Sequence, residues 1–303
     1  MSTIRLIRNP AMKKIIGRFK RMASNGVSIL LEGETGTGKN FLAQQAHLLS
    51  DRSQGSFLPL ICGALPDTLF ESELFGYEKG AFTGAGNEKP GLVEMVRGGT
   101  LFLDEIENLS LSAQGKLLRV LDEKKFLRLG ALEEIDVAFR LVCASNKSLK
   151  YLIESGAFRK DLYYRIAAVH LVIPPLRDRA EDILPLANHF LEQKSKTMGK
   201  RFTLSRAAEE LLLRLPWPGN VRQLRDAIAI AVISAEDTLI RPADFSMALE
   251  HEDTSAGDES LAAAEKRHIA NVLQTYQGNR TKAARALQIT ETTLRNKIKK
   301  YGL

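Results

Sequence analysis

The sequence predicts an α/β fold with a parallel sheet, followed by a helical region and a small all-α module at the C-terminus. Apolar runs of strand length occur at Val27–Leu31, Phe57–Ile61, Thr100–Leu103, Phe139–Ala144 and Val169–Ile173. Most of these runs are continuous rather than alternating, which is typical of strands covered on both faces. Helical patterns such as Phe41–Leu49 and Ala113–Leu121 lie between them. Strands that alternate with helices favour a parallel sheet.

After Pro174 the strand signal disappears, and residues 181–250 read as helices broken at prolines. Residues 251–260 (HEDTSAGDES) are small, polar and acidic without periodicity, which predicts a flexible linker. Residues 261–303 are helical again. We therefore expect an α/β subdomain over 1–175, a helical lid subdomain over 176–250, a linker at 251–260 and a C-terminal domain over 261–303.

The composition is that of an ordinary soluble globular protein, with 44% hydrophobic and 26% charged residues. No apolar run approaches the ~18–20 residues that a membrane span needs, and the N-terminus lacks the pattern of a secretory signal. Cys62 and Cys143 each lie in an apolar run and read as buried thiols of a reduced compartment. We therefore expect a cytoplasmic protein without a membrane partner.

A phosphate-binding loop follows the first predicted strand. The segment reads Gly33, Glu34, Thr35, Gly36, Thr37, Gly38 and Lys39, and it precedes an amphipathic helix. The glycines let backbone N–H groups turn toward phosphates, Lys39 adds a charge, and the helix N-terminus adds its dipole. Asn40 stands where the motif has a Ser or Thr ligand of Mg²⁺. These eight residues are the predicted ATP-binding loop.

Two carboxylates follow another predicted strand, Thr100–Leu103. We expect Asp104 to hold the Mg²⁺ that accompanies ATP, and Glu105 to polarise the attacking water as a general base. Asn146 follows a third strand, and ligands bind at the carboxyl ends of such strands, so it can contact the γ-phosphate. The alternative is a buried strand that happens to end in an acidic turn. The order of the motifs favours an NTPase.

The segment Glu73–Ala85 reads ELFGYEKGAFTGA, which resembles the ELFGHEKGAFTGA signature of sigma-54-dependent activators, the bacterial enhancer-binding AAA+ proteins. The resemblance covers roughly residues 5–250 and 261–303. It implies an AAA+ P-loop fold with a helical lid and a mobile loop that contacts sigma-54 and moves with the nucleotide state. The residues of this loop are Gly80, Ala81, Phe82, Thr83, Gly84 and Ala85. Phe82 and Thr83 are the only sizeable groups that it presents.

Further segments carry the same resemblance. Residues 158–165 resemble FRxDLYYR, which implies that Arg159 and Arg165 act as catalytic fingers in the ATP site of a neighbouring subunit. An active ring follows, and a hexamer is expected. Residues 217–224 match WPGNVREL, which implies that Arg222 reaches the nucleotide phosphates. Asn220 can cap the helix that follows.

Other residues carry structural expectations. Trp217 is expected to pack the lid, and Glu181 and Asp182 are expected to form a solvated helix start.

Two departures from the family pattern bear on hydrolysis. Asn40 replaces the usual Glu. The family's switch Asn, which restrains the catalytic carboxylate until sigma-54 is engaged, precedes the Cys of an NCAAL motif. Residues 60–65 of this chain read LICGAL, so Ile61 occupies that position. Because isoleucine cannot hydrogen-bond Glu105, our hypothesis is that hydrolysis is less tightly gated, or that a partner subunit in a mixed ring supplies the gating.

The C-terminal segment predicts a DNA-binding domain. Residues 261–303 hold nine Lys/Arg against two Glu, which gives this segment a net charge of +7. A helix over 265–275, a short helix over 282–287, a turn at Gln288 and a basic helix over 291–300 form a helix-turn-helix pattern. This pattern resembles the Fis-type domain that ends these activators.

Side chains of the basic helix and of the helix before it fall into two sets, those suited to base edges and those suited to phosphates. The candidates for base-edge contacts are Thr292, Thr293, Arg295 and Asn296. The candidates for phosphate contacts are Arg280, Lys282, Lys297 and Lys299.

Together these features predict a transcriptional activator that binds double-stranded DNA upstream of promoters. It would use ATP hydrolysis to convert the closed sigma-54 RNA polymerase complex to the open one, as a homo-oligomeric or mixed ring. No sensory domain precedes residue 1 of this sequence, so control is expected from expression level or a separate regulatory protein. A first alternative is a DNA-binding regulator with an impaired ATP site, acting in a mixed ring or without sigma-54. A second is an AAA+ machine for another polymer, which the GAFTGA loop argues against.

Overall fold

The computed structural model of the protein describes residues 6–64, 66–249, 265, 268–269, 272–273, 280–287 and 289–301. The chain forms two compact units, Met1–Ser246 and Met247–Leu303. The predicted linker at 251–260 lies outside the described residues. Within the part that the structure describes, no helix combines the length and the apolar character that a bilayer span demands.

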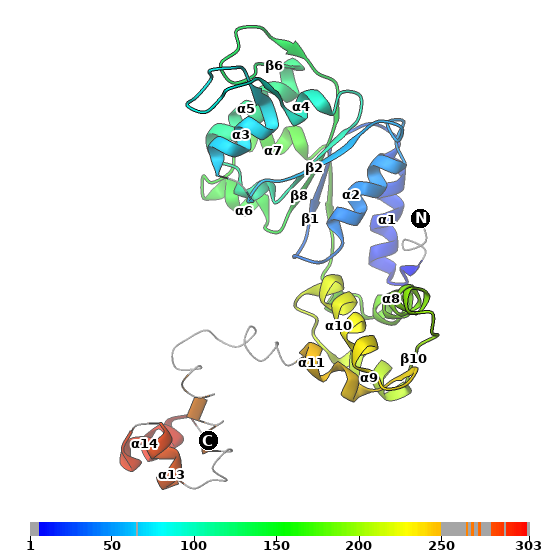
Figure 1. Cartoon of the computed structure of the whole chain (residues 1–303), viewed down its shortest axis with the longest axis vertical. Helices are drawn as coiled ribbons and strands as arrows, with labels where there is room; N and C mark the ends of the chain where they lie inside the picture. The colour runs from blue at the N-terminus through cyan, green and yellow to red at the C-terminus, as the bar shows by residue number, and fades with distance from the viewer. Residues whose placement is uncertain are drawn as a thin grey trace. The chain divides into compact units, whose positions relative to one another are not determined.

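The first unit is built on a five-stranded parallel sheet, which confirms the predicted α/β class (Figure 1). The strand order is β2-β5-β8-β1-β9. The bounds are β1 (Ile29–Glu32), β2 (Phe57–Ile61), β5 (Thr100–Asp104), β8 (Arg140–Ser145) and β9 (Val169–Val172). All five predicted strands are present, with small shifts at their ends. The central strands are buried on both faces, as their continuous apolar runs predicted.

Helices cover the two faces of the sheet and divide its side chains between two cores. On one face pack α1 (Pro10–Ala23) and α2 (Lys39–Leu48), with Ile29 and Leu31 of β1 beneath them. The other face carries Leu30 of the same strand. Its helices are α3 (Asp67–Phe75), α4 (Leu92–Met95), α5 (Leu111–Glu123), α6 (Leu149–Glu154) and α7 (Lys160–Ile166) (Figure 1).

Short elements complete this α/β body. The segment η2 (Ile106–Asn108) follows β5. Two antiparallel pairs project from the body: β3 (Gly76–Tyr77) pairs with β4 (Lys89–Pro90), and β6 (Lys125–Phe126) pairs with β7 (Ile135–Asp136). The loop Gly80–Ala85 therefore lies between two paired strands. The two cysteines, Cys62 and Cys143, are free and buried as predicted, and burial raises the pKa of the Cys143 thiol.

The helical region after the sheet is the lid. Its elements are η3 (Leu176–Asp178), η4 (Ala180–Asp182), α8 (Ile183–Met198), α9 (Arg206–Arg214), α10 (Asn220–Ser234), η5 (Pro242–Phe245) and α11 (Ser246–Leu249). A two-stranded parallel pair, β10 (Thr203–Leu204) with β11 (Leu239–Ile240), corrects the expectation that strands end at Pro174. These strands are too short to give a periodic signal. Trp217 is fully buried and donates from Nε1 to the Leu212 carbonyl at 2.8 Å, so it packs the lid as predicted.

The second unit contains the predicted helix-turn-helix. Helices α13 (Arg280–Ala286) and α14 (Glu291–Tyr301) pack through Ala283, Ala284 and Leu294 against Ile269. Of the first predicted helix, residues 265, 268–269 and 272–273 are described, and they are helical. Gln288, where a turn was predicted, lies outside the described residues.

Candidate nucleotide-binding site and partner surfaces

The glycine-rich loop joins the end of β1 to the start of α2. Lys39 begins the helix, and its Nζ donates to the Gly33 carbonyl at 2.6 Å and to Asn146 Oδ1 at 2.7 Å. Burial lowers the pKa of Lys39, while the nearby Asp104 carboxylate opposes this effect. An ammonium group held by carbonyl and amide oxygens has donors that phosphate oxygens can take over.

The carboxylates lie beside this lysine at the carboxyl edge of the sheet. Glu105 adopts a left-handed conformation (φ 56°), which is uncommon for a residue other than glycine. Its side chain accepts two amide hydrogen bonds, from Asn146 Nδ2 at 3.4 Å and from Asn108 Nδ2 at 3.2 Å. Asn146 therefore joins the Lys39 ammonium to the Glu105 carboxylate. The fold brings together these three residues, which the sequence placed on separate segments.

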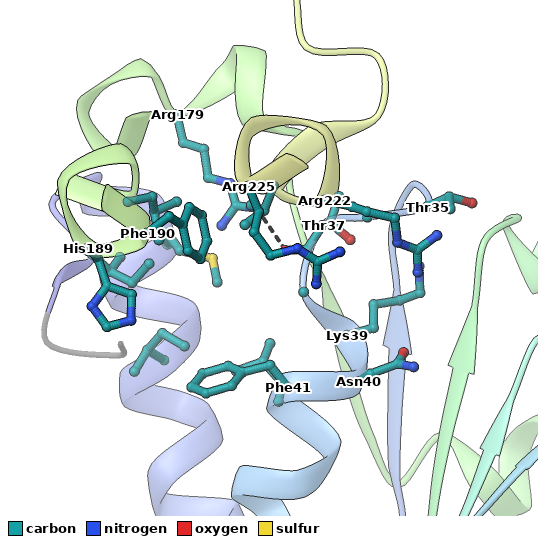
Figure 2. A pocket seen from close by; sticks show the side chains of 18 of the residues that line it. Thr35, Thr37, Lys39, Asn40, Phe41, Arg179, His189, Phe190, Arg222 and Arg225 are labelled. Atoms are coloured by element: carbon teal, nitrogen blue, oxygen red, sulfur yellow. Dashed lines mark hydrogen bonds between the residues drawn. The ribbon is translucent and has the colours of Figure 1, made fainter. Parts of the chain in front are cut away.

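A pocket of about 460 Å³ opens at this edge, within the ~300–1,000 Å³ usual for ligand sites (Figure 2). One end is apolar and is lined by Ile7, Met12, Ile16, Phe41, Leu186 and Phe190. The other end is polar and includes most of the predicted site residues: Thr35, Gly36, Thr37, Gly38, Lys39, Asn40, Asp104, Glu105, Asn146 and Arg222. Such a pocket can bind a molecule with an aromatic end and an anionic end.

Gly33 and Glu34 do not line the pocket. Glu34 instead binds the lid, because Arg177 donates to both of its carboxylate oxygens, from Nη1 to Oε2 at 2.8 Å and from Nη2 to Oε1 at 2.5 Å. The hydrogen bond from Arg177 holds the pKa of Glu34 below its ordinary value. The phosphate loop is thus tied to the segment that leads into the lid.

Asn220 strengthens the same connection, and its predicted role as a helix cap is wrong. Its Oδ1 accepts from the Leu176 backbone N–H at 2.7 Å, and its Nδ2 donates to the Thr35 carbonyl at 3.0 Å. The helix begins without a side-chain cap, and Asn220 itself has φ 54°. Asparagine tolerates this left-handed conformation better than most residues. A tertiary contact has replaced the local one that the sequence suggested.

Three arginines of the lid approach the pocket (Figure 2). Arg222, which was predicted, and Arg225 both extend from α10. Arg179 is buried, and its Nη2 donates to the Thr37 carbonyl at 2.8 Å. Arg179 and Arg225 were missed, because an isolated arginine in a sequence is indistinguishable from a solvated one. Their charges make this end of the pocket suitable for phosphates.

The start of α8 is not a solvated turn, contrary to the expectation for Asp182. This residue is fully buried, and its Oδ1 accepts from the backbone N–H groups of Arg8 and Asn9. Glu181 is exposed, and its Oε2 accepts from Asn9 Nδ2 at 2.9 Å. Both carboxylates fix the segment before α1, which borders the apolar end of the pocket through Ile7.

The Gly80–Ala85 loop is closed on itself and presents an aromatic side chain. The Gly80 N–H donates to the Ala85 carbonyl at 2.9 Å. Phe82 is 45% exposed and its ring meets the edge of Tyr77 at a centroid distance of 4.9 Å. Thr83 is exposed. The tip therefore offers an aromatic ring and a hydroxyl to a partner.

One arginine organises the base of this loop. Arg128, which follows β6, binds both oxygens of Glu94 at 2.9 Å and Glu78 Oε1 at 3.0 Å. The backbone N–H of Glu78 also donates to the Leu129 carbonyl at 2.9 Å. Sequence reasoning missed Arg128, because its partners are far from it along the chain.

The two predicted finger arginines lie on or beside α7 and do not line the pocket. Arg159 pairs with Asp161 at 2.7 Å. Arg165 pairs with Asp122 at 3.0 Å and donates to the Leu121 carbonyl at 2.7 Å. The side chains of both arginines are 44% exposed. Both guanidinium groups are accessible from outside the unit.

The predicted DNA-contacting residues of α14 differ in how exposed their side chains are. Thr292, Arg295 and Asn296 are exposed at positions that share one helix face. Thr293 instead bonds Thr290 through their hydroxyls at 2.8 Å, next to the helix start. Lys282 and Arg280 of α13 are also exposed.

Lys297, a candidate for a phosphate contact, forms an ion pair within the unit. Its Nζ pairs with Glu265 Oε1 at 2.5 Å, and its side chain is 28% exposed. The Tyr301 hydroxyl donates to the other oxygen of Glu265 at 2.6 Å. The carboxylate of Glu265 neutralises the charge of Lys297. The side chain of Lys299 lies outside the described residues.

Three family models match consecutive parts of the chain. Residues 6–172 match the sigma-54 interaction domain, residues 177–262 match an AAA+ ATPase lid domain, and residues 260–301 match the Fis family of bacterial regulatory proteins.

Two curated relatives illustrate the similarity. The regulatory protein AtoC of Escherichia coli is 40% identical over 98% of this chain, which spans 68% of AtoC. The Nif-specific regulatory protein of Azospirillum lipoferum is 44% identical over 80% of this chain, which matches 39% of that relative. The chain thus corresponds to between about two fifths and two thirds of the length of these relatives.

Among solved structures, NtrX of Brucella abortus has the same fold. Its ADP complex superposes with a TM-score of 0.73 at 28% identity, covering 97% of this chain and 68% of NtrX. An ATP complex of NtrX gives a TM-score of 0.74 at 27% identity over the same shares.

Proposed function

The chain belongs to the family of sigma-54-dependent transcriptional regulators, with an AAA+ P-loop NTPase core and a Fis-type helix-turn-helix, and from this premise we propose that it is an ATPase that opens promoter complexes. In this proposal it hydrolyses ATP to ADP and phosphate and converts the closed complex of sigma-54 RNA polymerase to the open complex. The observation that carries the proposal is the convergence of Lys39, Asn146 and Glu105 at one end of the pocket.

The pocket fits ATP in both shape and charge. The apolar end, with Phe41 and Phe190, can enclose a purine base, and the polar end supplies Lys39 and the lid arginines for the phosphates. Gly36 keeps the loop in a left-handed conformation (φ 80°) where backbone N–H groups can turn toward an anion. NtrX of Brucella abortus, which was solved with ADP and with ATP, shares this fold.

Asp104 is the residue that would hold Mg²⁺. Among the described residues no cluster of three or more His, Cys, Asp or Glu could bind a metal without other ligands. Mg²⁺ usually takes one or two protein carboxylates together with substrate phosphates and water, and Asp104 supplies one such carboxylate at the pocket. When bound, the ion would neutralise charge on the phosphate oxygens. The amide of Asn40 lines the same pocket and can accept from a water bound to it.

In hydrolysis the roles divide between two subunits. Glu105 accepts a proton from the attacking water. Lys39 and Arg222 bind the γ-phosphate, which the water attacks, and the β-phosphate of the leaving ADP. Arg159 and Arg165 would enter the pocket of the neighbouring subunit and neutralise transition-state charge. Each must first leave its present partner, Asp161 or Asp122. Because both arginines act in the pocket of a neighbouring subunit, activity depends on a ring, which we expect to be a hexamer.

The site connects to the exposed loop through the fold. Ile61 at the end of β2 pairs with Asp104 of β5. The chain then runs through α3 into β3, which leads to the Gly80–Ala85 loop. A change at Glu105 on nucleotide turnover could therefore move α3 and the loop. Phe82 and Thr83 at the tip are the groups that would contact sigma-54.

The C-terminal unit would hold the ring on double-stranded DNA in the cytoplasm. Arg295, Asn296 and Thr292 share an exposed face suited to base edges, whereas Arg280, Lys282 and Lys299 would bind phosphates. Lys297 contributes to the packing of the unit through Glu265.

A second candidate is a DNA-binding regulator whose ATP site is impaired. Asn40 and Ile61 favour it, because both replace residues that the family uses at the site. The intact contacts of Lys39, Asn146 and Glu105 argue against it.

ATP turnover distinguishes the two candidates. We expect the purified protein to release phosphate from ATP at concentrations that allow a ring. Glu105→Gln should bind a fluorescent ATP analogue but not hydrolyse ATP, and Lys39→Ala should lose binding. Absence of turnover by the unmodified protein in every assembly state would favour the regulator without ATPase activity.

A further inference from the structure

The carboxylate of Glu105 has an amide donor on each oxygen. Asn146 Nδ2 donates to Oε1 at 3.4 Å. Asn108 Nδ2 donates to Oε2 at 3.2 Å, and no sequence motif singled this residue out. Asn108 ends η2, the turn that Glu105 itself begins, and its backbone N–H donates to the Glu105 carbonyl at 3.0 Å. The backbone thus places the Asn108 amide within reach of the carboxylate.

The space that Asn108 occupies exists because residue 63 is glycine. A Cβ built on Gly63 would lie 2.5 Å from Asn108 Nδ2 and 3.0 Å from Glu105 Oε2. Any side chain at this position would therefore displace the Asn108 amide from the carboxylate. The family motif NCAAL has an alanine at this position. Gly63 is thus a departure from the pattern at the point where Asn108 meets Glu105.

Ile61, one of the two departures named above, lies close to Gly63 at the end of the same strand. Ile61 is the last residue of β2, is 48% exposed and pairs with Asp104, one residue before Glu105. It carries no polar group, so it cannot donate to the carboxylate. The family's asparagine amide at position 61 is therefore absent, and so is the methyl group of the family's alanine at position 63. The amide of Asn108 reaches Glu105 through the space that the missing methyl group leaves.

We propose that Asn108 is a positioning residue that restrains Glu105 in the place of the strand-end asparagine, an inference that rests on the proposed ATPase function. The restraint lies within the subunit. It therefore replaces both earlier hypotheses, that hydrolysis is poorly gated or that a partner subunit supplies the gating.

Asn108 donates to Oε2 of Glu105, the carboxylate oxygen that Asn146 does not bind. While Oε2 accepts from Asn108, the carboxylate is held in one orientation and has less acceptor capacity for the attacking water. Release of Asn108 frees that oxygen. The restraint should therefore lower the rate of the chemical step and leave ATP affinity unchanged, because Asn108 is not among the residues that line the pocket.

The experiment compares steady-state hydrolysis by four variants of the full chain. Asn108→Ala removes the amide, and Gly63→Ala displaces it while leaving it in the sequence. Both should raise basal kcat several-fold, up to about tenfold, the effect of losing one ordinary hydrogen bond of about 0.5–1.5 kcal/mol. KM for ATP should not change. Asn25→Ala, on an exposed turn, and Gly17→Ala, where a Cβ meets nothing within 4 Å, are the matched controls and should leave kcat unchanged.

Rescue separates positioning from a structural effect. Adding Ile61→Asn to Asn108→Ala restores an amide from the strand end and should return kcat to the basal value. The proposal is overturned if the unmodified protein hydrolyses ATP and both Asn108→Ala and Gly63→Ala keep its kcat. It is also overturned if KM rises with kcat, or if Ile61→Asn fails to lower the raised kcat. If the unmodified protein shows no hydrolysis in any assembly state, the proposed function itself fails, and this inference fails with it.

Discussion

Arg177 binds both carboxylate oxygens of Glu34, and this contact joins the lid to the phosphate loop. Asn220 reaches the same loop through the Thr35 carbonyl, and the backbone N–H of Val221 donates to the Gly36 carbonyl at 3.0 Å. The phosphate loop is therefore held from the lid side as well as from the sheet. Movement of the lid would be transmitted to the residues that bind phosphate.

The Arg177–Glu34 contact predicts a dependence of stability on pH. The pKa of Glu34 is lowered from 4.5 chiefly by the hydrogen bond from Arg177, so the folded state favours the carboxylate. Stabilisation is present above pH 4.5 and is lost as the pH falls through the lowered pKa. Because both groups are largely exposed, the contribution is about 1 kcal/mol or less.

Thermal unfolding of the intact protein and of Arg177→Ala measures this contribution. The variant should melt at a lower temperature at pH 7, and the difference between the two melting temperatures should shrink in acid, as the pH falls below 4.5 through the lowered pKa of Glu34. An equal difference at both pH values would assign the effect of Arg177 to packing rather than to its charge.

The conformation and surroundings of Gly36 predict that alanine is poorly tolerated at this position. Its φ is 80°, and an added Cβ would lie 2.3 Å from the Gly219 carbonyl oxygen of the lid. Gly38 has φ 104° but a Cβ there meets nothing within 4 Å. Gly36→Ala should therefore cost backbone strain of about 1–3 kcal/mol together with a displaced lid, whereas Gly38→Ala should cost the strain alone. Unfolding of the nucleotide-free protein should rank them in this order, and equal losses would contradict the lid contact.

The contacts of Arg128 bear on how well ordered the Gly80–Ala85 loop is. Arg128→Ala removes the hydrogen bonds to Glu94 and Glu78 that fix the loop base. Amide hydrogen exchange over residues 76–86 should accelerate about tenfold, which corresponds to about 1.4 kcal/mol of local stability. Arg119→Ala, which breaks an exposed pair with Glu123, is the control and should leave exchange at the loop unchanged. Unaltered exchange in Arg128→Ala would show that the backbone bonds alone hold the loop.

In the C-terminal unit, we expect Lys297 and Lys299 to have different roles. Lys297→Ala should destabilise the unit, because Glu265 loses its partner, and should change the salt dependence of DNA binding little. Lys299→Ala should weaken binding to all duplexes alike and reduce the salt slope by about 0.9, the value for one phosphate contact. Anisotropy titrations with one duplex at several salt concentrations measure both slopes. A full unit of slope lost in Lys297→Ala would mean that this lysine contacts phosphate instead.

The strands and the phosphate site were predictable because their signals are local and strong. The continuous apolar run at Thr100–Leu103 is typical of a strand covered on both faces. Lys39 belongs to a phosphate-loop motif that can be recognised in the sequence. The helix α1 was missed, although Asn9 and Pro10 mark its start, and Met12, Ile16 and Phe19 bury one face. That periodic signal was available in the sequence.

The remaining contacts could not be derived from local patterns. Asn220 and Asp182 both stand where a helix begins, and capping and a solvated turn are the local expectations. In the structure each side chain instead satisfies backbone groups from a distant segment, at Leu176 and at Asn9. Asn108 could have been suspected only indirectly, because Gly63 stands where the NCAAL motif has an alanine, and the sequence does not show that this glycine lies beside Asn108 and Glu105.

The measurement that tests the central claim most directly is open-complex formation on a sigma-54 promoter, with purified polymerase and this protein in excess. With ATP, the unmodified protein should produce open complexes, and Thr83→Ala should hydrolyse ATP at the same rate without producing them. ATP hydrolysis by the unmodified protein without open complexes, or open complexes formed equally well by Thr83→Ala, would contradict the account.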